Sequence, residues 1–479
     1  MNLPLLLLAV YSVLLILIGL WIARLVKNAG DFFVAGRRLT APLLFATVLA
    51  ANIGAGSTIG AAGLAYRDGL SAWWWNGSAA IGSLGLAFLI GPRIWRIAHA
   101  HNLYTAGDFL EWRYSAPVRG VVSSLIWIGT LFILAGQLIA GAAVLSVVAD
   151  LPRWAGALIG GVVMTIYFMA GGLLSSAWVN LVQLVVLLGG FAVAVPMIVS
   201  KAGGFAAIAH AGAAAPGFTN VLYSSGPGSG WALLFLLAPG FVISPGLVQK
   251  AYGAADARTV RIGIGVQAIV LMVFALLPVA IGMALRVAQP GIEIRDQVLP
   301  IAFAHHLPPL LGALALAAVF SAEVSTCDAI LFMLATSLSQ DLYKRFVNPG
   351  AGDRKVLSVA RIASAVGGGL GVLLAVVLPP SVINALTIFY SLLAVSLFVP
   401  IVGGLFTTSA GSAEAFAAIA AGVLTRLAVQ VFNNGRGVGI LDPTLLGTIA
   451  AAVAFLTTML VRGKFIWATS SGLTEKQLR

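Results

Sequence analysis

The chain is poor in charge. Of its 479 residues, 15 are acidic and 27 are basic, so charged residues make up 9% of the sequence, whereas a soluble globular domain contains about 25%. Hydrophobic residues make up 60%, and the mean hydropathy is +1.03. So few charges cannot cover the water-facing surface of a chain this long. The sequence therefore predicts an integral membrane protein.

Cysteine and recognisable enzyme motifs are also scarce. The single cysteine, Cys327, excludes an internal disulfide and a thiolate metal cluster. The five histidines do not have the spacing of metal ligands, and the sequence contains no HExxH, Walker A or GxSxG motif. We therefore expect a protein that is not an enzyme.

Apolar runs of the length needed to cross a bilayer recur about thirteen times along the chain. The loops alternate in charge, and the loop after the first run already carries Arg24, Lys27, Arg37 and Arg38. The positive-inside rule then predicts a multi-pass protein of the inner (plasma) membrane, with its N-terminus outside and its C-terminus in the cytoplasm. Because the net charge of +12 follows from this topology, we expect no nucleic-acid partner.

Two of the apolar runs contain helix breakers near their centres. Residues 48–66 read VLAANIGAGSTIGAAGLAY, and residues 236–249 read LLAPGFVISPGLVQ. Glycines in such runs often serve close helix packing, but these two runs begin two sets of five spans, 41–199 and 229–407. Interrupted helices at matching places in two halves are typical of an inverted-repeat secondary transporter with a site at the membrane midplane.

Polar side chains lie at membrane depth in the run 317–343. Helical geometry puts Ser325 and Thr326 on one narrow face, with Glu323 to one side and Asp328 to the other. Hydroxyls together with freed carbonyls suit a small monovalent cation, although each hydroxyl can instead bond its own helix. Carboxylates at this depth usually face a cavity or a partner, which favours a functional site.

Other polar or aromatic residues are open to two interpretations. Gln137 and Asn180 either contact a ligand or bridge two helices, and Gln137 is the better solute candidate because small residues surround it. The aromatic run Trp73, Trp74 and Trp75 either stacks on a ligand or forms part of an interfacial belt.

With these residues the chain resembles the sodium:solute symporter family. The motifs that carry the resemblance span nearly the whole sequence and keep their order and spacing. They are DFFVAGRRL (31–39), AANIGAGSTIG (50–60), YTAGDFLEWRY (104–114), GGLLSSAWVNLVQ (171–183), PGLVQKAYGAADA (245–257) and SAEVSTCDAILFMLATSLSQDLY (321–343).

The resemblance implies an all-α membrane protein of the LeuT-type fold, with two inverted five-helix repeats, one extra N-terminal helix and two extra C-terminal helices. The expected segments are the N-terminal helix and its cytoplasmic loop (1–40), the first repeat (41–199), an extracellular loop (200–228), the second repeat (229–407), two C-terminal helices (408–462) and a cytoplasmic tail (463–479).

The resemblance also implies one Na⁺ as the coupling ion. Its ligands would be the carbonyls of Ala50, Ile53 and Ala322 and the hydroxyls of Ser325 and Thr326. Relatives that use a second sodium ion often carry an acid where this chain has Asn180, and add hydroxyls where it has Asp328 and Ala329. We therefore predict one sodium ion and keep a second-cation or proton site open, formed by Asn180, Glu323 and Asp328.

The predicted function is Na⁺-coupled import of a small polar organic solute by alternating access. Sugar-transporting relatives carry an acid and a glutamine where this chain has Asn76 and Ser57, so an amino acid or a carboxylate is favoured over a sugar. The expected solute contacts are Ser57, Thr58, Asn76, Gln137, Phe241 and Tyr390. Two alternatives remain: a proton-coupled transporter that uses Asp328 or Glu323, and a nutrient sensor without coupled transport.

Overall fold

The structure is a computed structural model that describes residues 33–463. Within this range the gaps are 214–216, 224–229, 380, 434–436 and 439–440, and side chains are not described at 167–179 and 211–213. A few residues between 5 and 17 are also described. The expected N-terminal helix lies largely outside the described residues, and the tail from residue 464 lies wholly outside them.

Helices account for the regular structure of the first part of the described chain. In order they are η2 (Ala35–Arg37), α3 (Ala41–Asn52), η3 (Gly56–Gly60), α4 (Ala61–Asp68), η4 (Gly69–Ala72), α5 (Trp73–Gly85), η5 (Leu86–Ile90), α6 (Gly91–Ala100), α7 (Ala106–Arg113), α8 (Ala116–Ala149), α9 (Arg153–Lys201) and α10 (Gly204–Ala213).

The second part continues in the same way. Its elements are η6 (Gly230–Ala232), α11 (Leu233–Ile243), α12 (Pro245–Tyr252), α13 (Ala257–Phe274), α14 (Leu276–Ala288), η7 (Arg295–Gln297), α15 (Val298–His306), α16 (Pro309–Thr336), η8 (Ser337–Val347), α17 (Asp353–Val377), α18 (Val382–Leu393), η9 (Ala394–Phe398), α19 (Val399–Phe406), α20 (Ser412–Phe432) and α21 (Pro443–Val461).

Ten helical segments in the described part are long and apolar enough to cross a membrane. The fold is thus an all-helical membrane architecture, as expected, since the described β-pairing amounts to isolated bridges such as Leu39 with Ala254. The expected total of thirteen spans is not confirmed. One reason is α9, a single helical element of 49 residues where the sequence favours two spans.

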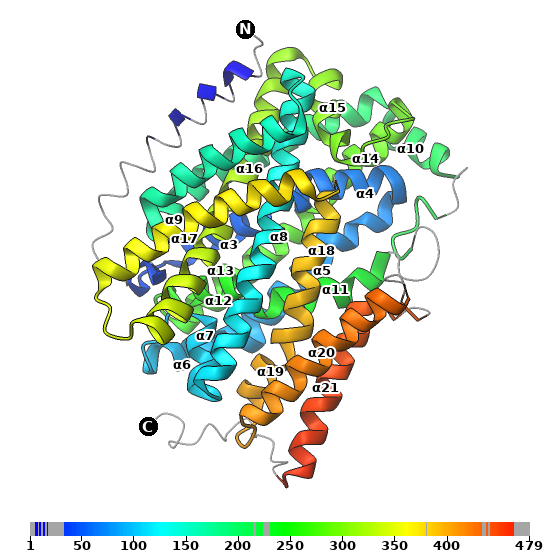
Figure 1. Ribbon diagram of the computed structural model, residues 1–479. Helices are drawn as coiled ribbons and strands as arrows, with labels where there is room; N and C mark the ends of the chain where they lie inside the picture. The colour runs from blue at the N-terminus through cyan, green and yellow to red at the C-terminus, as the bar shows by residue number, and fades with distance from the viewer. Residues whose placement is uncertain are drawn as a thin grey trace.

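Helix α16 lies at the centre of the molecule, and the two last helices lie at its edge. Helix α16 packs against α3, α8, α9 and α17, and 83% of its most apolar stretch is buried, against 22% for α20. Helices α20 and α21 pack mainly on each other and cross one flank of the bundle (Figure 1). Polar residues on α16 are therefore enclosed by protein rather than exposed to lipid.

Both expected helix interruptions are present. Helix α3 ends at Asn52, and Ile53 is extended, with φ −101° and ψ 90°, before the wide turn η3 leads into α4. Helix α11 ends at Ile243, and Ser244, with φ −48° and ψ 121°, leads into α12, which begins with Pro245. Backbone groups freed at such breaks need partners within the protein, and this places the candidate site.

Candidate functional site

Side chains from neighbouring helices hold the first break in place. Gln137, on α8, accepts a hydrogen bond from the Ala55 amide at 2.9 Å through its Oε1. Asn76, on α5, donates to the Ser57 carbonyl at 2.9 Å through its Nδ2. The Ser57 hydroxyl donates in turn to the Asn52 carbonyl. Buried polar groups of the unwound segment are thus satisfied partly by side chains of α5 and α8 and partly within the segment.

The hydroxyls of α16 meet the carbonyl that α3 presents just before its break. Thr326 Oγ1 lies 3.0 Å from the Ala50 carbonyl, and Ser325 Oγ lies 3.3 Å from it. Ser325 Oγ also donates to the Ala322 carbonyl at 2.9 Å. All of these residues are at least 96% buried. Four of the five predicted sodium ligands therefore share one small cluster of neutral oxygens.

The fifth predicted ligand, Ile53, lies at the break itself. Its side chain is fully buried, and its amide donates to the Leu49 carbonyl at 2.9 Å. The extended conformation of Ile53 turns the chain away from the axis of α3. Its carbonyl consequently lies outside the regular hydrogen-bond ladder of that helix.

Gly54 allows α3 and α16 to approach this closely. A Cβ atom on Gly54 would lie 2.4 Å from Thr326 Oγ1 and 2.8 Å from Gln137 Oε1, far inside van der Waals contact. The absence of a side chain at this position is therefore required for the hydroxyls of α16 to reach the break.

A polar cavity adjoins the break and the hydroxyl cluster. It is lined by Ala51, Asn52, Gly54, Gly56, Ser57, Trp75, Asn76, Ala79, Gln137, Leu237, Phe241, Thr326, Leu386 and Tyr390. The centre of a water molecule can occupy a volume of about 20 Å³ within the cavity. This is room for one or two water molecules. The structure thus describes a contracted state of the cavity.

Aromatic rings cover the cavity. Phe241 from α11 stacks on Tyr390 from α18, with centroids 4.9 Å apart and an interplanar angle of 29°. Trp75 meets Tyr390 edge-on at 6.4 Å. These rings come from both halves of the chain, so a change in their relative position changes the size of the cavity.

Five of the six predicted solute contacts line this cavity: Ser57, Asn76, Gln137, Phe241 and Tyr390. Thr58 does not, because it is fully buried and its hydroxyl donates to the Gly54 carbonyl at 2.9 Å. Sequence reasoning did not select Asn52, or Trp75 ahead of its two neighbours. Trp75 is 3% exposed, whereas Trp74 donates to the Val221 carbonyl in an exposed position.

The residues kept open for a second cation or a proton fall into two places. Glu323 is fully buried, neither of its carboxyl oxygens has a hydrogen-bond partner among the described residues, and Oε2 faces Gly141 of α8. Asn180 donates to Thr47 Oγ1 at 3.4 Å, close to the ammonium of Lys250. The negative charge of Asp328 interacts electrostatically with the ammonium of Lys250. The sequence analysis did not single out Lys250.

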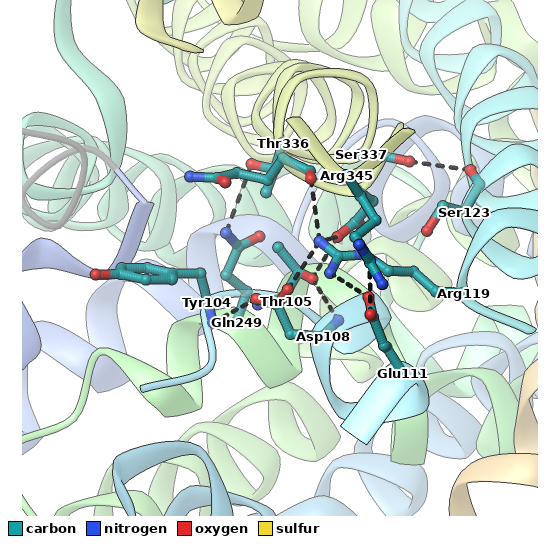
Figure 2. Close-up of polar contacts among 12 residues, drawn as sticks. Tyr104, Thr105, Asp108, Glu111, Arg119, Ser123, Gln249, Thr336, Ser337 and Arg345 are labelled. Carbon is teal, nitrogen blue, oxygen red and sulfur yellow. Dashed lines mark hydrogen bonds and ion pairs between the residues drawn. The ribbon is translucent and has the colours of Figure 1, made fainter. Parts of the chain in front are cut away.

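One end of the molecule is held by ion pairs centred on Arg119. We call Arg119, Asp108, Glu111, Asp341, Thr105 and Arg345 the Arg119 cluster. Arg119 lies 2.7 Å from an Asp108 oxygen and 2.9 Å from one of Glu111 (Figure 2). It also lies 2.8 Å from an oxygen of Asp341. Thr105 Oγ1 donates to Asp341 at 2.6 Å. The cluster joins α7, the start of α8 and η8.

The other end has its own polar contacts. Asp296, in η7, accepts a hydrogen bond from the Val382 amide at the start of α18, at 2.9 Å. Burial raises the pKa of the Asp296 carboxyl to about 6, while this hydrogen bond and the charges of Arg153 and Arg295 act against the rise. Arg153 donates to the Leu378 carbonyl at 2.6 Å. These contacts connect η7 to the start of α18, and α9 to the end of α17.

The cluster of oxygens around the Ala50 carbonyl suits weak binding of a monovalent cation. Its oxygens are neutral carbonyls and hydroxyls, whereas Ca²⁺ sites use several carboxylates. Among the described residues, no group of three or more histidine, cysteine, aspartate or glutamate side chains could hold a metal ion. Thr326 both approaches the Ala50 carbonyl and lines the cavity, so the cluster of neutral oxygens is contiguous with the cavity.

Several relatives with curated descriptions are named as sodium-coupled transporters. The sodium/glucose cotransporter of Vibrio parahaemolyticus is 27% identical over 400 residues, which cover 75% of this chain and 72% of that protein. The sodium/pantothenate symporter of Escherichia coli is 26% identical over 441 residues, which cover 88% and 89%. The solutes in these names differ, so the names leave the solute of this chain undetermined.

The fold agrees with solved transporter structures. A Na⁺-coupled sialic acid symporter, in a substrate-bound outward-open state, superposes with a TM-score of 0.82 at 20% identity, over 96% of this chain and 98% of that one. Mhp1, a nucleobase-cation-symport-1 family transporter, gives 0.60 at 14% identity, over 95% and 100%. The model of the sodium:solute symporter family matches residues 32–422. The chain is a multi-pass membrane transporter, not an enzyme, and it belongs to the sodium:solute symporter family.

Proposed function

We propose that the protein imports a small polar organic solute together with one Na⁺, and that the solute is an amino acid or a carboxylate rather than a sugar. The ion would bind among the carbonyls of Ala50, Ile53 and Ala322 and the hydroxyls of Ser325 and Thr326. The two inverted five-helix repeats expected from the sequence would supply the alternating access.

The observation that carries the proposal is the double role of Thr326. Its hydroxyl lies 3.0 Å from the Ala50 carbonyl, and the same residue lines the polar cavity. A cation bound there would draw α3 and α16 together and fix the wall that the solute contacts. Binding of the ion would therefore favour binding of the solute, which is the reciprocal coupling that symport requires.

The chemistry of the cavity supports the class of solute. Its polar lining residues are amides and hydroxyls (Asn52, Ser57, Asn76, Gln137 and Thr326), and none of its lining residues carries a charge. Amide and hydroxyl side chains of this kind can donate hydrogen bonds to a carboxylate.

The ion gradients supply enough free energy for uptake. One charge that crosses a potential of 100 mV yields about 2.3 kcal/mol, and a tenfold Na⁺ gradient adds about 1.4 kcal/mol. The sum, about 3.7 kcal/mol, concentrates a neutral solute roughly 500-fold.

The first experiment is the thermal melting shift of the purified protein in NaCl against KCl and choline chloride, at two pH values. We expect a saturable rise specific to Na⁺, and the same assay then screens amino acids and carboxylates. A shift that depends on pH but not on Na⁺ would instead favour proton coupling through Glu323 or Asp328. A rise with a solute that depends on neither Na⁺ nor pH would favour a nutrient sensor without coupled transport.

For a solute found in this screen, Gln137→Ala tests the contact with the cavity. We expect solute affinity to fall at least tenfold, because the amide faces the cavity and because its Oε1 holds the Ala55 amide. Na⁺ binding measured without solute should change much less. An unchanged solute affinity would remove Gln137 from the site.

A further inference from the structure

A lysine is enclosed within the helix bundle one turn from the proposed sodium site. Lys250, on α12, is 1% exposed, although burying an unpaired ammonium costs several kcal/mol. Its Nζ donates to the Thr47 carbonyl at 2.7 Å and to Thr47 Oγ1 at 2.9 Å. Thr47 precedes Ala50 by one turn of α3. The ammonium is thus held in a fixed position by the helix that also carries the sodium ligands.

The surroundings of the ammonium resemble the shell of a bound cation. Two oxygens come from Thr47, Asn180 of α9 donates to the same hydroxyl, and Asp328 of α16 supplies the negative charge that acts on Lys250. Four helices, α3, α9, α12 and α16, therefore converge on a single positive charge. Asp328 is itself 4% exposed, so the two opposite charges compensate each other away from water.

We propose that Lys250 is a tethered cation that fills a second cation position, formed by Thr47, Asn180 and Asp328, and so limits the protein to one mobile Na⁺. This inference rests on the proposed sodium site. Because the ammonium is covalently attached to α12, it never leaves with the solute, and in the state described its charge offsets that of Asp328. Removing it would leave the Thr47 carbonyl and hydroxyl without this donor in a protein-enclosed space where the negative charge of Asp328 acts, so a mobile Na⁺ would take its place.

The test measures the binding of ²²Na⁺ to the full-length purified protein without any solute. We expect the wild type to bind one Na⁺ per chain and Lys250→Met to bind two, with a steeper dependence on Na⁺ concentration. Lys250→Gln keeps a donor for Thr47 and serves if the methionine variant does not fold. Lys355→Met, which removes an exposed lysine of α17, is the matched control and should bind one.

Asp328→Asn tests the same inference by removing the negative charge instead of the ammonium. With its counter-charge removed, Lys250 places an uncompensated positive charge one turn from the sodium site, so the apparent Na⁺ constant should rise at least tenfold. The double variant Lys250→Met with Asp328→Asn removes both charges. It should restore an affinity near that of the wild type, with one Na⁺ per chain. A purely structural role for the pair would predict no such recovery.

The possible outcomes separate this inference from the proposed function. If the wild type binds no Na⁺, the sodium site itself is wrong. If the wild type binds one Na⁺ and Lys250→Met or Lys250→Gln also binds one, Lys250 does not occupy a cation position. An unchanged Na⁺ constant in Asp328→Asn would overturn the inference in the same way.

Discussion

Thr326 occupies a position where one hydroxyl serves two neighbouring sites. It approaches the Ala50 carbonyl, and it lies on the wall of the cavity beside Gln137. In the proposed mechanism, a residue in this position would link the ion to the solute without a long chain of intermediates. At the scale of single residues, the proposed coupling would therefore depend on one side chain and the helix break that it faces.

The hydroxyl pair gives the most direct prediction at this scale. Replacing Ser325 and Thr326 by alanine removes two oxygens from the cluster around the Ala50 carbonyl. We expect the apparent Na⁺ constant to rise tenfold or more, a loss of at least about 1.4 kcal/mol. The titration of the melting temperature with NaCl measures it.

Ser364→Ala provides the matched control. Ser364 is also fully buried in a membrane helix, but its hydroxyl donates to the Ala360 carbonyl of its own helix, α17, at 2.9 Å. Its Na⁺ constant should equal that of the wild type. If the double alanine variant responds to Na⁺ as the control does, the hydroxyls are not ligands.

Interrupted helices are the elements that the sequence predicts best. Glycine and proline act on the local backbone, so Gly54, Gly56 and Pro245 indicate where α3 and α11 end. The side chains that complete the breaks are harder to predict. Gln137 is 82 residues from Ala55, and Lys250 is 203 residues from Thr47. Only the packing of distant helices brings these pairs together.

The same argument explains why the sequence analysis did not select the right side chains around the cavity in every case. The sequence placed Trp73, Trp74 and Trp75 together at a span end, yet only Trp75 turns inward to the cavity, because successive residues of a helix point in different directions. The threonine at 58 faces its own helix break rather than the cavity. The direction in which a side chain points from a short broken helix depends on tertiary contacts that the sequence pattern does not encode.

Gly54→Ala tests the close approach of α3 and α16. Its Cβ would overlap Thr326 Oγ1, so either the helices separate or the break shifts. We expect a lower melting temperature and the loss of the Na⁺-dependent rise. Gly369→Ala, in an exposed part of α17 with no atom near its Cβ position, should keep the Na⁺ response and be neutral or slightly stabilising. Equal behaviour of the two variants would contradict the close approach.

At the scale of the whole molecule, the cavity lies between two ends that are held by different chemistry. The Arg119 cluster joins α7, α8 and η8 through several charges. The opposite end depends on the contacts of Asp296 and Arg153 with backbone groups near the start of α18. Conditions that weaken one end need not weaken the other.

Arg119→Met should destabilise the protein by about 3 kcal/mol or more, because it leaves the buried carboxylate of Asp341 without its charged partner. The Arg119 side chain is 8% exposed and that of Asp341 is 5% exposed. Arg345→Met is the control, since Arg345 is 42% exposed and pairs only with Glu111 among the ion pairs described. Its cost should stay below about 1 kcal/mol. Unfolding in denaturant compares the two, and similar costs would argue against a central role for Arg119.

The carboxyl of Asp296 predicts a dependence of stability on pH. Its pKa is about 6 in the folded protein, against 3.8 in a free side chain. The folded state therefore binds the proton more tightly, and stability falls as pH rises from about 4 to about 6, then levels off. The full difference is roughly 2–3 kcal/mol.

Asp296→Asn keeps an oxygen that can accept from the Val382 amide but cannot ionise. The decline between pH 4 and pH 6 should therefore be smaller in this variant by the same amount. Melting temperatures across the pH range give the comparison. Parallel curves for the two proteins would show that the pKa of Asp296 is the same in the folded and the unfolded state.

The small size of the cavity has a consequence for osmotic stress. In the state described, the space beside Thr326 admits one or two water molecules, so any solute must enter a wetter conformation. Polymers too large to enter that conformation draw water out of it and push the population toward the contracted one. The slope of the logarithm of the uptake rate against polymer osmotic pressure thus measures the volume of water that the cavity gains between the contracted and the wetter conformation.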